Sequence, residues 1–112
     1  MFCRIVAAFL LLCVLASNTA EGRPAKWCGW WLRQHLGVTD TRYDRAREWA
    51  RYGSQASGPG IGVIVVWRHH VGIITGAGDE PGRWIVKSGN DGGRVRERER
   101  DVSRAIAFRW PR

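Results

Sequence analysis

The chain has 112 residues, which predicts one small domain with one hydrophobic core and excludes a multidomain protein. It contains no internal repeat and no long low-complexity segment, so an array of repeats is excluded as well. Its 18 basic residues against 10 acidic ones give a formal charge of +8. This excess favours an anionic environment, such as a cell wall, an outer envelope or a nucleic acid, although solubility alone also explains it.

Residues 1–20 have the pattern of a signal peptide. After a basic start, residues 5–16 form an apolar run of about a dozen residues, which is the length of a signal-peptide core. A membrane span needs roughly twenty residues, so an uncleaved anchor is the less favoured alternative. Cleavage near Ala16 or at Ala20 leaves a single domain, 21–112, which we expect to be secreted or periplasmic.

Export changes how the cysteines are interpreted. Cys3 and Cys13 leave with the signal peptide, so Cys28 is the single cysteine of the mature chain. Exported domains usually have their cysteines in disulfide pairs. A lone cysteine is an intermolecular link, a working thiol or simply a small buried apolar residue. Loss of Arg4 leaves 17 basic and 10 acidic residues, a charge of +7, and all seven tryptophans stay to build the core.

Residues 26–36 predict an α-helix with a cysteine in its first turn. Cys28, Trp31 and Leu32 recur at helical spacing, and Gly37 is a suitable C-terminal stop. A thiol in the first turn lies at the positive end of the helix dipole, which favours the thiolate. The thiolate is the form in which cysteine acts as a nucleophile.

A second helix is predicted from Asp40 or Thr41, either of which can cap it, to Gly53, which ends it. Apolar residues at helical spacing lie on one side and arginines on the other, so we interpret the apolar side as core. The next residues, 54–60, are rich in Ser, Gly and Pro and predict a connecting loop.

From Ile61 onward the pattern changes to strands and short turns. Residues 61–67 are mostly β-branched and apolar, which is typical of a strand covered on both faces. Two helices followed by strands and short turns predict an α+β fold, with N-terminal helices packed on an antiparallel sheet of about five strands. The further strands are expected at 70–75, 83–88, 94–98 and 104–110, with turns at 76–82 and 89–93.

Residues 94–101 alternate between basic and acidic side chains. A nucleic-acid patch would be more uniformly basic. We therefore interpret this run as an edge strand whose charges protect it from aggregation.

A cysteine nucleophile needs a base, and histidine is the usual one. His35 lies on the same helical face as Cys28 but about 10 Å along the axis, too far to contact the thiol. His69 and His70 point to opposite sides if both lie in a strand. Gly72 shares the side of His70 and leaves it bare, so a helix or a substrate can approach closely there. We therefore choose His70, with a histidine that has no catalytic role as the alternative.

The base in turn needs a group that orients its imidazole. The strand beside His70 is expected to be 83–88, and Asn90 follows its end. Asn90 can accept a hydrogen bond from the imidazole and fix its tautomer. Asp91 is a rival for this role, and Asn90 is equally well explained as a turn residue, because Asn-Asp-Gly-Gly is good turn chemistry.

The order of these motifs resembles the small papain-like cysteine hydrolases of bacterial cell walls, the CHAP and NlpC-type group. The resemblance covers Trp27 to Pro111: a cysteine opens a Trp-rich helix, a β-branched strand and a His-Val-Gly strand follow, and a later strand ends in Gly-Asn. It implies a papain-like fold in which Cys28 is the nucleophile, His70 the base and Asn90 the third polar residue.

Two features depart from the pattern of that group. Gly62-Val63 stands where members usually have Gly-Asp at the opening of a strand. Many members also have an upstream side chain, often Tyr, that helps to hold the oxyanion, and residues 21–27 contain no tyrosine.

The resemblance implies hydrolysis of an amide bond in peptidoglycan by an endopeptidase or an amidase. The expected partner is peptidoglycan or its peptide stems, and no nucleic acid is expected. No cofactor or metal is expected either, since one cysteine and dispersed histidines lack metal-ligand spacing. Two other functions stay open: a wall-binding module of the same fold without turnover, and a cationic exported protein that binds nucleic acid or anionic lipid.

Overall fold

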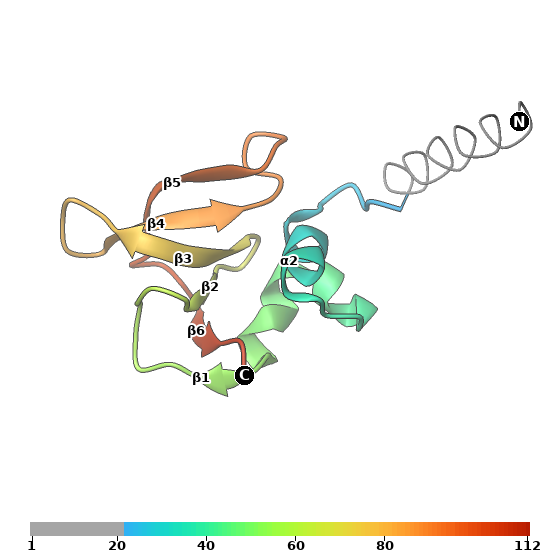
Figure 1. Ribbon diagram of the computed structural model, residues 1–112, viewed down its shortest axis with the longest axis horizontal. Helices are drawn as coiled ribbons and strands as arrows, with labels where there is room; N and C mark the ends of the chain where they lie inside the picture. Colours follow the sequence, from blue (N-terminus) through green and yellow to red (C-terminus); the bar gives the residue numbers. More distant parts are fainter. Residues whose placement is uncertain (1–21) are drawn as a thin grey trace, which may run out of the picture.

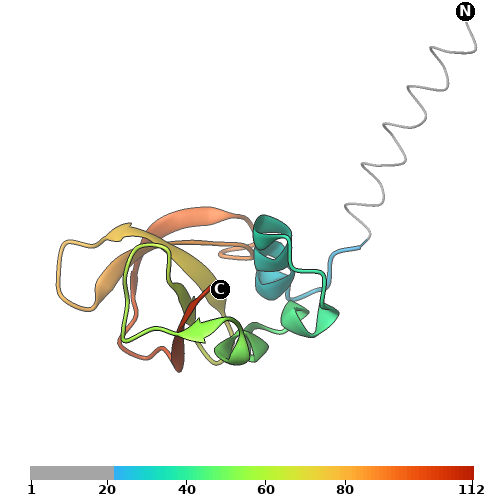
Figure 2. The ribbon, with the colours of Figure 1, turned by 60° about the horizontal axis from the view of Figure 1, so that its bottom comes forward.

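The computed structural model describes residues 22–112 (Figure 1). The predicted signal peptide, residues 1–20, lies outside the described residues. The chain forms one antiparallel sheet of six strands with its helical segments gathered at one end of that sheet (Figures 1 and 2). The α+β class and the antiparallel sheet predicted from the sequence are confirmed.

Helix α2, Cys28–Leu36, ends where the sequence predicts and begins two residues after the predicted start, with Trp27 as its N-cap. Gly37 ends it in the left-handed conformation, with φ 71°, and donates its backbone N–H to the carbonyl of Arg33. Glycine adopts this conformation without the steric penalty of a Cβ atom. The Arg33 side chain donates to the Val38 carbonyl at 3.1 Å and pairs with Asp44, so the end of the helix is tied to the segment that follows.

The predicted second helix is wrong in type, because the chain forms two short 3-10 segments instead. These are η1, Thr41–Asp44, and η2, Ala46–Arg51, with an extended Arg45 between them. Asp40 caps the first segment as expected, accepting the N–H of Arg42. The Tyr43 carbonyl, which a continuous α-helix would use internally, instead accepts the indole N–H of Trp49 at 2.7 Å.

The strands occur in the order β1-β6-β2-β3-β4-β5 across the sheet, and every neighbouring pair is antiparallel. Strand β4 has the predicted bounds, whereas the two-residue β1 lies inside the predicted loop. The predicted strand at 61–67 is shortened because Gly62 turns the chain with φ 88°. The bounds are β1 Ser54–Gln55, β2 Ile64–Val66, β3 Val71–Ala77, β4 Arg83–Ser88, β5 Arg96–Asp101 and β6 Ala107–Trp110.

Strand β2 lies at the centre of the fold and is buried on both faces, as its β-branched sequence predicts. Ile64 and Val66 pack in a core cluster with residues of α2 and η2, among them Leu32 and Trp49. Val65 faces a second cluster on the other side of the sheet. The first cluster is the one that joins the helical segments to the sheet.

Strand β5 contacts only β4 and forms one edge of the sheet, which confirms the edge-strand prediction. Its alternating sequence puts Arg96, Arg98 and Arg100 on one face and the acidic residues on the other.

Within residues 22–112, no helix has both the length and the apolar character needed to cross a membrane.

Candidate active site

Cys28 is the first residue of α2 and carries a free thiol. Its side chain packs in the first core cluster with Leu32 and Val71, and the residue is only 4% exposed. Cys28 nevertheless lines a surface cleft of about 400 Å³. The sulfur therefore lies at the boundary between the core and an opening to solvent.

The surroundings of the thiol act on its pKa in opposite directions. Burial raises the pKa of Cys28, because a thiolate loses its hydration there. Backbone N–H groups of Val71, Gly29 and Cys28 itself donate towards the sulfur and lower the pKa, as does the charge of Arg100. Burial is the larger effect, so the thiol is protonated at neutral pH and needs a base to become a nucleophile.

His70 immediately precedes β3, and Val71, the next residue, provides one of the N–H groups at the sulfur of Cys28. The start of α2 and the start of β3 therefore lie against each other, with the cysteine on one and the histidine beside the other. His70 Nε2 lies 2.8 Å from the hydroxyl oxygen of Ser88. The ring of Trp67 flanks the imidazole, with ring centroids 5.8 Å apart.

Burial lowers the pKa of His70 to about 4, and the charge of nearby Arg100 lowers it further than Asp91 raises it. The imidazole is therefore neutral over most of the pH range. A neutral imidazole has a free nitrogen to accept a proton, but a pKa of about 4 makes it a weak base towards a thiol whose pKa is raised.

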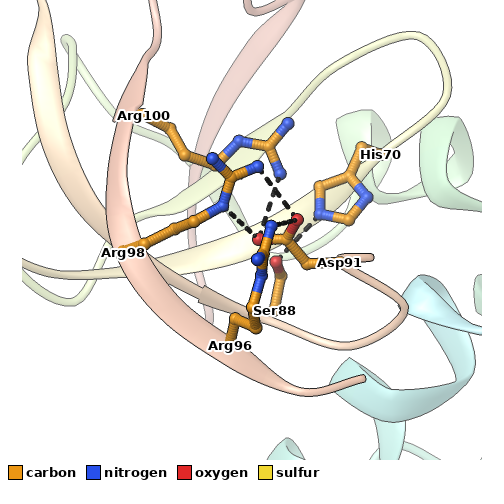
Figure 3. Close-up of polar contacts among 6 residues, drawn as sticks. All are labelled: His70, Ser88, Asp91, Arg96, Arg98 and Arg100. Atoms are coloured by element: carbon orange, nitrogen blue, oxygen red, sulfur yellow. Dashed lines mark hydrogen bonds and ion pairs between the residues drawn. The ribbon is translucent and has the colours of Figure 1, made fainter. Parts of the chain in front are cut away.

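Ser88, at the end of β4, holds the place beside the imidazole that the sequence analysis gave to Asn90 (Figure 3). Ser88 is fully buried. Asn90 lies in the following turn with a positive φ of 51°, and no hydrogen bond joins it to His70 in the part of the chain that the structure describes. Asparagine tolerates this left-handed conformation, which accounts for its presence in the turn.

Gly72 leaves its face bare, as the sequence predicts, but β4 fills the space rather than a helix or a substrate. A Cβ atom on Gly72 would lie 2.6 Å from Val86 Cγ1 and 2.9 Å from Ser88 Cβ. Such distances are too short for real contacts, so any other residue would push β4 away. Gly72 therefore lets Ser88 approach His70. Ile73 pairs with Lys87, so in this antiparallel pair the next residue, Ser88, comes opposite Gly72 and close to His70. A correct prediction of this strand register would have pointed to Ser88.

Asp91 lies under the arginine face of β5, as Figure 3 shows. Arg98 donates to it twice, from Nε at 2.8 Å and from Nη2 at 2.9 Å, and Arg96 Nη2 donates at 3.1 Å. Arg100 Nη1 lies 3.8 Å away. The hydrogen bonds from Arg98 are the main cause that holds the pKa of Asp91 well below its usual range. Asp91 thus binds arginines and does not hydrogen-bond His70.

The other two histidines lie in different settings. His35 stacks on Trp31, with ring centroids 4.9 Å apart, on the exposed side of α2. His69 is exposed and lines the cleft beside Cys28.

Helix α2 also contacts the end of β4 through Gly89. A Cβ atom on Gly89 would lie 2.4 Å from Trp31 Cβ and 2.9 Å from Trp27 Cζ3. The absence of a side chain therefore sets how closely the helix that carries Cys28 approaches the strand that carries Ser88.

Replacing Ser88 with alanine should lower kcat about tenfold to a hundredfold in any reaction that uses His70, because the buried imidazole nitrogen loses its partner. The matched variant is Asn90→Gly, since glycine keeps the positive φ and removes the side chain. This variant should keep wild-type kcat. Steady-state rates of the two variants check the assignment, and the reverse ranking would give the orienting role back to Asn90.

Within residues 22–112, no group of three or more His, Cys, Asp or Glu side chains is placed to hold a metal ion. The chain matches no protein-family model, no curated protein and no solved structure. The site must therefore be interpreted from its own geometry.

Proposed function

We propose that this protein is an exported cysteine hydrolase of the papain-like type that cleaves amide bonds in peptidoglycan. The observation that supports this best is the meeting of α2 and β3, where the Cys28 sulfur lies at the N–H of Val71 and His70 is the preceding residue. A cysteine at a helix N-terminus, packed against the start of a strand that follows a histidine, is consistent with the arrangement that the resemblance to CHAP and NlpC-type hydrolases implies. The secreted or periplasmic location follows from the predicted signal peptide.

In the proposed reaction, neutral His70 accepts the proton of the Cys28 thiol while the sulfur attacks the amide carbonyl carbon. The carbonyl oxygen becomes an oxyanion, and we propose that the N–H groups of Gly29 and Val71, which are directed at the sulfur, stabilise it. His70 then returns the proton to the leaving amine, and the C–N bond breaks to give a thioester on Cys28. A water molecule, deprotonated by His70, attacks the thioester and releases the carboxylic acid and the thiol.

Ser88 orients the base in this scheme. Its hydroxyl lies at His70 Nε2, so it leaves Nδ1 as the nitrogen that exchanges the proton with Cys28. Serine takes the part that asparagine plays in a Cys-His-Asn set.

The reaction should have an acid limb near pH 4. His70 must be neutral to accept the thiol proton, and its pKa is lowered to about 4. Below that pH, kcat/KM should fall about tenfold per pH unit, and above it kcat/KM should be level. A pH profile of kcat/KM, with circular dichroism at each pH as the control for folding, measures the limb. A limb near 6.5 would mean that His70 is a solvated histidine and not the buried base.

The proposed function is tested by incubating purified peptidoglycan with the protein and analysing the soluble products by mass spectrometry. Hydrolysis releases one new amine and one new carboxylate for each bond cut, and the pair identifies an endopeptidase or an amidase. No new pair of ends at any pH from 4 to 8 would contradict the proposal.

A wall-binding module without turnover is the second candidate. The low exposure of Cys28 and the rise in its pKa favour it, as does the lack of a tyrosine in the residues just before Cys28. Such a module would sediment with peptidoglycan without releasing fragments, and a Cys28→Ala variant would bind as tightly as the wild type.

A further inference from the structure

Six of the nine residues that line the cleft beside Cys28 carry charged side chains. The cleft has a volume of about 400 Å³ and lies between the start of α2, the η1–η2 segment and the turn before β3. The charged residues are Lys26, Asp44, Arg45, Arg47, Glu48 and Arg68.

The basic residues of this cleft are free to bind a ligand, whereas one of its two acids is already neutralised. Asp44 pairs with Arg33, which lies outside the lining. In the part of the chain that the structure describes, none of the four basic residues takes part in an ion pair, and neither does Glu48. Four unpaired bases against one unpaired acid give the lining a net charge of +3.

The cationic lining continues beyond the cleft. Glu48 also borders two further hollows. One of them shares Arg47 and Arg68 with the cleft and extends the basic lining to Arg51. The other shares Arg45 but adds only Arg42, which is paired with Asp40 in the same lining, so it brings no further net charge. The cleft and the hollow at Arg51 therefore form one basic groove along η2, with Cys28 in the lining of the cleft.

We infer that this groove selects the substrate of Cys28 by its carboxylates, so that the acyl donor is an acidic peptide bound by Arg45 and Arg68. The inference rests on the proposed function and adds the class of substrate and the residues that determine it. A peptide fits better than a nucleic acid because Glu48 also lines the groove and would repel a continuous phosphate backbone, whereas a peptide can place its separate carboxylates at Arg45 and Arg68 and away from Glu48. No Trp, Tyr or Phe lines the three openings to stack on bases.

The charge of the cleft can be measured without any substrate, by alkylating Cys28 with iodoacetate, an anion, and with iodoacetamide, its neutral counterpart. Peptide mass spectrometry follows Cys28 alone, separately from Cys3 and Cys13. The ratio of the two rate constants, relative to the ratio for N-acetylcysteine, reports the potential at the thiol. We expect this relative ratio to exceed one in the wild type and to fall towards one at 0.5 M salt.

Arg45→Glu and Arg68→Glu should each lower the relative ratio about fourfold at low salt, for a change of two charges on the order of 10 Å away in water. Arg104→Glu is the matched control, because it makes the same change in net charge at an exposed site. Arg104 follows β5 near Asp101, which pairs with the start of β4, the end away from Ser88. An unchanged ratio in both cleft variants, or an equal fall in the control, would overturn the inference.

Specificity is measured with two peptide amides that differ only in Glu or Gln on the acyl side of the cleaved bond. We expect wild-type kcat/KM to favour the Glu peptide about tenfold, and the Arg45→Glu/Arg68→Glu double variant to lose or reverse this preference. Equal kcat/KM for the two peptides in the wild type would contradict the inference while leaving the hydrolase proposal intact.

If neither peptide is cut, the ligand class is judged by protection of Cys28 from iodoacetamide, while the hydrolase proposal is judged separately by the digestion of peptidoglycan. Protection by poly-glutamate that is lost in the double variant would support binding of an acidic peptide. Protection by a DNA oligonucleotide but not by poly-glutamate would overturn it and favour the nucleic-acid alternative.

Discussion

A Cys28→Ala variant should keep its fold and lose hydrolysis of peptidoglycan by at least about 10⁴-fold. In the proposed mechanism the sulfur forms the acyl-enzyme, and no other cysteine lies in residues 22–112 to replace it. Alanine fills most of the space of the cysteine in the core cluster around Leu32, so the free energy of unfolding should fall by only about 1 kcal/mol. Release of soluble fragments measures activity, and urea denaturation measures stability.

Two further measurements serve as controls for this prediction. Cys28→Ser keeps a polar atom at the same place but lowers the nucleophilicity, so it should also fall to background. The wild type treated with iodoacetamide until Cys28 is fully modified should behave like the alanine variant. Full activity in Cys28→Ala would remove the nucleophile from the scheme and with it the proposed mechanism.

An Asp91→Asn variant should lower the free energy of unfolding by about 2–4 kcal/mol. Asp91 is only 5% exposed and is the one acid among three arginines, so its loss leaves Arg96, Arg98 and Arg100 to repel each other. Asp91 lies in the turn after β4, so the repulsion should destabilise this turn and the end of the strand that carries Ser88. Urea denaturation of both proteins at neutral pH and low salt measures the loss.

Asp40→Asn is the matched control for this prediction. Asp40 pairs with Arg42 on the surface, where the side chains are 48% and 65% exposed, and an exposed pair contributes about 0.5 kcal/mol or less. Asparagine also keeps the cap of η1. Equal losses in the two variants would mean that the cluster around Asp91 is an ordinary surface network.

The Asp91 cluster should also make the fold sensitive to acid. The pKa of Asp91 is lower in the folded chain than in the unfolded one, mainly through its hydrogen bonds with Arg98. The stabilisation is therefore complete at neutral pH and is lost as the pH falls below the usual range of an aspartate, about 4. The Asn variant lacks this part of the acid dependence.

The parts of the fold that were predicted correctly are those set by neighbouring residues. Helix α2 ends at Gly37 because glycine alone takes that φ at no cost, and β2 is buried because its side chains are β-branched and apolar. The second helix was wrong in type, and the indole of Trp49, six residues further along, takes the Tyr43 carbonyl that a continuous α-helix would use internally. Strand β1 was missed because its two polar residues pair only through β6.

The residues of the candidate site were likewise predicted where local sequence determines them and missed where pairing with a distant segment does. Cys28 and His70 could be chosen from local patterns, a helix start and a His-Val-Gly strand. The structure places them at the meeting of α2 and β3. Ser88 was missed because serine at a strand end carries no signal of its own, and its role depends on which residue β3 places opposite. The arginines of β5 were predicted to be part of a charged edge strand. Their acidic partner, Asp91, lies in the preceding turn, and no periodic pattern in the sequence predicts that pairing.

Gly89 couples the two halves of the candidate site mechanically. Its φ is not positive, so the demand for glycine there comes from the close approach of Trp31 and Trp27. A methyl group at this position would have to displace either the helix that carries Cys28 or the strand that carries Ser88. A substitution at Gly89 would therefore alter the spacing of the Cys28 helix and the Ser88 strand without touching either residue, and a smaller ring at Trp31 would not restore it, because the closest atom is the Cβ that almost every residue has.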